Sequence, residues 1–188
     1  MTRSIGGSTL PLWYVEPGYK FSSLPWTPQL NLRCAHFTGD PDPNDRLKQS
    51  YDPLFTTGGD RGFGSWFLGE IFGQYISPNS NLNVAMAHLK FAPLDTMETG
   101  IIYYDFHFDQ TAQFNNSAIT SKNAAQEVDF YSVWSPTGWL TVSGVVGFAV
   151  PGAGLKQAAQ AFVIENGPAG GRVGRTMTLA EVFASIKY

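Results

Sequence analysis

The chain has 188 residues, a formal net charge of -3 and a sequence pI near 5.5. This length allows one domain with a sizeable core, and the acidic balance excludes the basic surface that nucleic acid requires. Charged residues make up only 14% of the chain, whereas aromatic residues reach 14%, so we expect much of the surface to face something other than water. Cys34 is the single cysteine, which excludes an internal disulfide.

Alternating apolar and polar residues predict strands along the chain. No apolar stretch approaches the roughly 18 to 20 residues of a membrane-spanning helix. Residues 12–21 and 29–37 are joined by a short turn with prolines and predict a β-hairpin. Pro17 lies inside the first run and cannot donate to a ladder, so it predicts an edge position, a bulge or an unpaired end. Residues 65–75 and 81–91 predict a second hairpin.

The clearest strand is residues 100–109, with the sequence GIIYYDFHFD. Successive side chains of a strand point to opposite faces. One face therefore carries Ile102, Tyr104, Phe106 and Phe108, and the other carries Ile101, Tyr103, Asp105 and His107. From this pattern alone, the apolar face belongs either on a protein core or on the lipid side of a membrane barrel.

Three more strands are expected at residues 126–134, 140–150 and 175–188, with a modest helical candidate at 155–164. The total is about eight antiparallel strands. Short turns and long loops alternate between them, except after residue 91, and the long loops are 38–64, 110–125 and 151–174. Transmembrane β-barrels have short turns on one side and long loops on the other, so this pattern predicts an all-β membrane barrel segment over residues 1–188.

Six short segments occur in one order along the chain: YVEPGYKF at 14–21, AHFTGD at 35–40, YDPLF at 51–55, GSWFLGEI at 64–71, IYYDF at 102–106 and VPGAG at 150–154. Together they resemble the C-terminal part of the alginate export family of bacterial outer-membrane porins. The resemblance implies a monomeric antiparallel barrel of about 18 strands, of which this chain supplies a part. It also implies passive diffusion of an anionic polysaccharide or other small solutes, with membrane lipid and the rest of the barrel as partners.

Under this interpretation the aromatic face of residues 100–109 is expected on lipid, and charged residues are expected to line the lumen and contact solute. The expected lumen residues are Lys20, Arg33, Glu70, Lys90, Asp105, His107 and Asp129. Basic side chains that project into a lumen would attract carboxylates, or would pair with lumen acids instead. Trp66 is expected to line the path by the same facing rule.

Other chemistries have weaker support in the sequence. Asp40, Asp42 and Asn44 have the spacing that opens a calcium loop, but the required glycine is Asp45 and the bidentate glutamate position is Tyr51, so a solvated loop is favoured. If the strands at residues 100–109 and 126–134 pair, a cluster of acids with a histidine could bind a metal or transfer protons. The interpretation of these side chains as a polar lumen lining is favoured over a metal or proton-transfer site. The members of that cluster would be Asp105, His107, Glu127 and Asp129.

No nucleophile-elbow, paired-cysteine or phosphate-loop motif is present in the sequence. We therefore expect no catalytic residue, metal or cofactor, and no enzyme activity. Two alternatives remain open at this point. The chain could be a soluble all-β carbohydrate-binding domain, or a small closed eight-stranded membrane barrel without transport.

Overall fold

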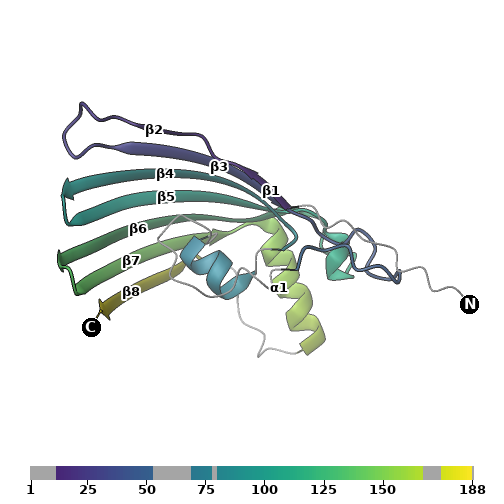
Figure 1. The fold of residues 1–188 in the computed structure, drawn as a ribbon. Helices are drawn as coiled ribbons and strands as arrows, with labels where there is room; N and C mark the ends of the chain where they lie inside the picture. Colours follow the sequence, from purple (N-terminus) through teal and green to yellow (C-terminus); the bar gives the residue numbers. More distant parts are fainter. Residues whose placement is uncertain (1–11, 53–68, 78–79, 167–174, 188) are drawn as a thin grey trace, which may run out of the picture.

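The structure, a computed structural model, describes residues 12–52, 69–77, 80–166 and 175–187. Its main feature is one antiparallel eight-stranded sheet that does not close (Figure 1). The strands are β1 (Leu12–Val15), β2 (Gly18–Lys20), β3 (Gln29–Phe37), β4 (Leu82–Leu94), β5 (Met97–Phe108), β6 (Asn123–Thr137), β7 (Leu140–Pro151) and β8 (Met177–Ile186). The predicted all-β antiparallel architecture of about eight strands is confirmed.

The first predicted strand is divided in two. β1 and β2 both pair with β3, and the ladder is interrupted at Glu16 and Pro17. A backbone hydrogen bond from the Leu32 N–H to the Pro17 carbonyl, 2.9 Å long, spans the gap. The hairpin and the edge position of Pro17 are therefore as predicted, because proline has no N–H to offer a ladder.

Within the described residues, the long connections contain three helices: the π-helix η1 (Gly69–Ile76), the 3-10 helix η2 (Ala112–Phe114) and the α-helix α1 (Ala153–Asn166). α1 confirms the helical candidate at 155–164. η1 overturns the predicted strand over residues 65–75, whose first part lies outside the described residues. Glu70, Ile71 and Phe72 are all buried, and three consecutive buried residues do not fit the alternation of a strand.

Loss of that strand also removes the exception in the predicted connections. The turns after β2, β4 and β6 are short, and β4 and β5 are joined tightly at the pair Leu94 and Met97. The connections after β3, β5 and β7 are long. Figure 1 shows the three short turns together at one end of the strands and the long connections at the other end. In the described parts of the chain, no helix is long and apolar enough to cross a membrane.

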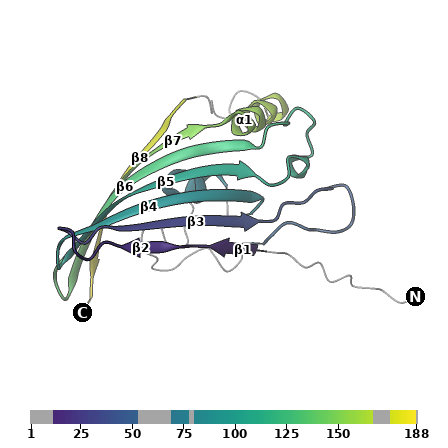
Figure 2. The same ribbon diagram turned by 90° about the horizontal axis from the view of Figure 1, so that it is seen from above.

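The sheet is curved, and η1 lies against its concave face (Figures 1 and 2). Paired residues of neighbouring strands point to the same face of the sheet and form rows across the strands. One concave row consists of Arg33, Met86, Tyr104, Glu127 and Ala149. The neighbouring convex row consists of Leu32, Ala87, Tyr103, Val128 and Phe148.

The predicted facing of β5 is wrong. Its aromatic face lies on the concave side and is buried in the core, while the opposite face is convex and partly exposed. The buried residues are Ile102, Tyr104, Phe106 and Phe108. The physical reason is that helices cover the concave face, so that Phe106 stacks on Phe72 of η1 at a ring distance of 4.4 Å, and Leu155 of α1 joins the same core cluster.

Candidate functional site

The concave face changes character along the strands. Near the long loops it is an apolar core, whereas toward the short turns it is polar. The Arg33 guanidinium forms an ion pair with Glu16, with Nη2 at 2.7 Å and Nε at 2.8 Å from Oε2. Asn31 donates to Glu16 Oε1 at 3.2 Å, and Gln29 donates to Asn31 Oδ1 at 2.9 Å. These side chains form a hydrogen-bonded line across β3 and the β1–β2 edge.

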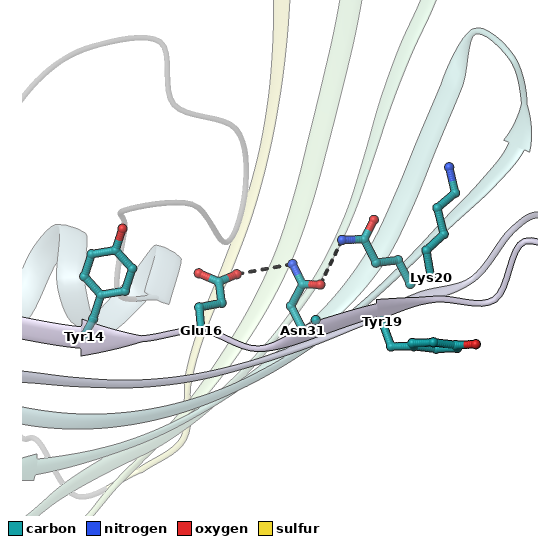
Figure 3. A pocket seen from close by; sticks show the side chains of 7 residues that line it. Tyr14, Glu16, Tyr19, Lys20 and Asn31 are labelled. Atoms are coloured by element: carbon teal, nitrogen blue, oxygen red, sulfur yellow. Dashed lines mark hydrogen bonds between the residues drawn. The ribbon is translucent and has the colours of Figure 1, made fainter.

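An open pocket of about 650 Å³ lies along this line. Its lining residues are Tyr14, Glu16, Gly18, Tyr19, Lys20, Gln29 and Asn31. Figure 3 shows Tyr14, Glu16, Asn31 and Lys20 projecting to one side of the edge strands, whereas the Tyr19 ring lies on the other side. The pocket therefore offers amide, carboxylate and ammonium groups to a polar solute.

A second network of hydrogen-bonded side chains crosses β4, β5 and β6. His88 Nε2 lies 2.8 Å from Tyr131 Oη, which donates to Glu98 Oε1 at 2.8 Å. Lys90 Nζ lies 3.4 Å from the other oxygen of Glu98. A Cβ at Gly100 would lie 2.6 Å from the Tyr131 ring, so this glycine leaves the space that the ring occupies. This network brings an imidazole, a phenol and an ion pair together in one region of the concave face.

A third group consists of acids at η1. Both oxygens of Glu127 accept backbone N–H groups of η1, from Ile71 and Phe72, at 2.8 Å each. Asp129 Oδ2 accepts the N–H of Glu70 at 3.3 Å. Glu127 and Asp129 are only 1% and 0% exposed, and they hold the start of η1 against the sheet.

η1 contributes two further polar groups to this region. Burial, together with the nearby carboxylates of Glu127 and Glu181, raises the pKa of Glu70 to about 7. At the other end of η1, Tyr75 Oη donates to Glu181 Oε1 of β8 at 2.6 Å. Glu70 therefore binds its proton more tightly than an exposed glutamate does, and η1 touches both β6 and the edge strand β8.

The sequence profile for alginate export matches residues 7–162. The chain belongs to the alginate export family. No curated protein and no solved structure matches it. The profile spans β1 to β7 and most of α1, so the polar line, the pocket and the acids at η1 all lie within the family region, apart from Glu181.

The structure of this alginate export chain places the predicted lumen residues on both faces of the sheet. Lys20, Arg33, Lys90 and Asp129 lie on the concave face, and Glu70 lies on η1 over the same face. Both concave ion pairs, Arg33 with Glu16 and Lys90 with Glu98, show that basic side chains pair with acids there, which was one of the two predicted behaviours. Trp66 lies outside the described residues.

Asp105 and His107 are placed differently from the prediction. They lie on the convex face, and His107 Nε2 is 3.2 Å from Asp105 Oδ2. Their strand does pair with β6, which was the condition for the cluster, but the register sets Asp105 opposite Gln126 and Tyr104 opposite Glu127. Asp105 and His107 therefore lie on the opposite face from Glu127 and Asp129, and the four do not form one cluster.

The candidate calcium loop consists of local turns in this structure. The Asp42 N–H donates to Asp40 Oδ1 at 3.2 Å, and the Asn44 N–H donates to Asp42 Oδ1 at 3.1 Å. Within the described ranges, no three or more His, Cys, Asp or Glu side chains are grouped as metal ligands.

Several residues of the site were not among those predicted from the sequence. Gln29 and Asn31 share the parity of Arg33, so the alternation of their strand was a usable signal for them. The ion pairs that Glu16 and Glu98 form depend on pairing across strands. No local signal marks such pairs, because the partners are brought together by the register of the sheet.

Proposed function

We propose that this chain forms part of the wall of a porin-type β-barrel in the bacterial outer membrane. Solutes would cross by passive diffusion along the concave face, without catalysis. The solutes are an anionic polysaccharide or other small polar molecules. Membership of the alginate export family supports export or transport across the outer membrane as the general role.

The observation that carries this proposal is the exposed apolar surface of the convex face. Its exposed large apolar side chains lie on β3 and on β5 to β8, with the smaller Ala85 exposed on β4 between them. They include Leu32, Ile101, Tyr103, Phe130, Val146, Phe148, Val150 and Val182. A continuous exposed apolar surface of this kind marks contact with a membrane or a partner. Lipid fits it, because apolar residues outside and polar residues inside are the pattern of a transmembrane barrel.

The dimensions of this surface suit an outer membrane. Along β7 the convex positions from Leu140 to Val150 are apolar throughout, a length of about 34 Å at 3.4 Å per residue. With a strand tilt of 35–45°, that length spans about 25 Å, the height of the apolar band in such barrels. Exposed tryptophans lie at both ends of the strands, with Trp13 on the long-loop side and Trp134 and Trp139 on the short-turn side, as in interfacial aromatic girdles.

The directions of the edge strands determine what can close the sheet. β1 and β2 share one edge, so the sheet is seven strands wide and β8, at the other edge, runs in the same direction as β1 and β2. Direct closure between the two edges would require a parallel pair. An all-antiparallel barrel with an even number of strands, as in bacterial outer membranes, therefore needs an odd number of further strands. This argues against the small barrel closed by this sheet alone.

The concave face has the properties of a diffusion path rather than of a reaction centre. Its basic side chains, Lys20, Arg33 and Lys90, are interspersed with acids. Rings of charged side chains of mixed sign can orient polar solutes without binding them tightly, which passage requires.

The proposal is tested by partition and conductance of the full-length protein. We expect the protein to require detergent for extraction, to float with phospholipid vesicles and to produce discrete conductance steps in planar bilayers. A chain that is folded and monodisperse in water without detergent would refute the membrane assignment and favour the carbohydrate-binding domain. A correctly folded, membrane-inserted protein that shows no conductance would refute the pore.

A further inference from the structure

η1 is placed well inside the concave face rather than at its rim. Its contacts are to Glu127 and Asp129, which lie four and six residues from the long-loop end of β6. At about 3.4 Å per residue this corresponds to about 14–20 Å along the strand. A helix at that depth occupies cross-section that a solute would otherwise use.

The wall of the sheet is shaped to receive η1. Gly69 begins the helix at φ +82°, and a Cβ there would lie 2.8 Å from the Glu127 carboxylate. On β7, a Cβ at Gly147 would lie 2.7 Å from Asp129 Oδ1 and 3.3 Å from Ile71 Cδ1. Both glycines are needed at these positions because a side chain on either one would push the helix away from the wall.

The two acids under η1 are otherwise hard to explain. Burial of a carboxylate is unfavourable unless hydrogen bonds compensate for lost water, and Asp129 Oδ1 is buried without a hydrogen-bond partner. These carboxylates accept three successive N–H groups at the start of η1. The acids therefore attach the helix to β6.

The far end of η1 is attached as well. Tyr75 donates to Glu181 of β8, and Phe72 in the middle of the helix is fully buried against Phe106. The helix is thus fixed to β5, β6 and β8, on one side of the concave face. The polar line of Glu16, Asn31 and Arg33 lies across the hollow on β3 and its edge.

We propose that η1 is the internal constriction of the pore, and that Glu127 and Asp129 are the positioning residues that hold it against the wall. This inference rests on the proposed pore function. Solutes pass between η1 and the polar line, and the position of η1 sets their upper size. Detachment of η1 from β6 therefore widens the path without removal of any strand.

The test measures the single-channel conductance of the full-length protein and its exclusion limit for neutral polyethylene glycols. The variant is the double substitution Glu127→Ala and Asp129→Ala, which removes the acceptors of three backbone N–H groups of η1. We expect about a twofold rise in conductance and a larger exclusion limit, since a helix about 10 Å across leaves the path. The matched control is Asp105→Ala, which removes a convex carboxylate that does not contact η1, and it should keep the wild-type exclusion limit.

A second variant keeps the test valid if the double substitution does not fold. Tyr75→Cys with Glu181→Cys, in a Cys34→Ser background, places two thiols where the exposed side chains of η1 and β8 meet, and a short bifunctional maleimide links them. If η1 lies on the wall of the conducting pore, the cross-link forms in folded protein and leaves conductance unchanged. An unchanged exclusion limit in a conducting Glu127/Asp129 variant would overturn this inference alone, as would a cross-link that does not form or that blocks conduction. A folded, inserted wild type without conductance would overturn the pore itself.

Discussion

Substitution of Val146 by arginine separates a lipid-facing from a water-facing convex surface. Val146 is 42% exposed and lies near the middle of β7, in register with Phe130 and Ala180. If this surface lies in lipid, arginine at mid-depth lowers the free energy of unfolding by about 2–4 kcal/mol. On a water-exposed sheet face the same change stays within about 0.5 kcal/mol. The difference exceeds tenfold in the folding equilibrium.

The assay is reversible denaturation by guanidinium in phospholipid vesicles, followed by tryptophan fluorescence. The control is Leu140→Arg on the same convex face, about 20 Å further along the strand at 3.4 Å per residue. There arginine can reach the interface, so the cost falls to about 0–1 kcal/mol. Equal stabilities for the two variants and the wild type would refute the assignment of the convex face to lipid.

Three other substitutions test the concave face. Phe72→Ala should lower the free energy of unfolding by about 3–5 kcal/mol, because it leaves a cavity against Phe106, and a loss below about 1 kcal/mol in denaturation would contradict the packing of η1. Glu70→Gln should remove a pH dependence of the free energy of unfolding. The pKa of Glu70 is raised from 4.5 to about 7 in the folded protein, so between these pH values the folded state binds a proton that the unfolded state releases. The free energy of unfolding of the wild type therefore falls by about 3 kcal/mol as pH rises between these values. Parallel stability curves for variant and wild type would contradict this. Arg33→Met should leave Glu16 with the Asn31 hydrogen bond alone, lower the free energy of unfolding by about 1.5–3 kcal/mol and shift the reversal potential toward cations, while an unchanged reversal potential would place this pair outside the ion path.

Much of the sheet could be predicted from the sequence, because alternation is a local property. β3, β5, β6 and β7 have apolar residues at every second position for most of their length, and the interruption at Pro17 follows from the missing N–H of proline. The family could also be predicted, since its short segments occur in one order.

The facing of β5 could not be obtained in the same way. Ile101 and Tyr103 on one face are as apolar as Ile102 and Tyr104 on the other, so alternation defines two faces without saying which is covered. The answer depends on η1 and α1, which pack on the concave side. Without the positions of those helices, the sequence is equally compatible with lipid on that face.

The strand predicted over residues 65–75 failed for a non-local reason. The conformation of η1 depends on Glu127 and Asp129, which are more than 50 residues away in the sequence. They accept the N–H groups that a strand would have offered to a neighbour. Gly69, which has a positive φ, and Gly73 were local signs of a break, and a glycine alone does not distinguish a bulge from the start of a helix.

The most direct test of the account is the solvent environment of two cysteines in the reconstituted full-length protein, in a Cys34→Ser background. One is Phe148→Cys on the convex face, and the other is Lys90→Cys on the concave face. We predict that a membrane-impermeant maleimide labels position 90 and leaves position 148 unreacted, and that a lipid-borne quencher affects a probe at 148 alone. Labelling of position 148 from water, or quenching of position 90 by lipid, would contradict the central claim.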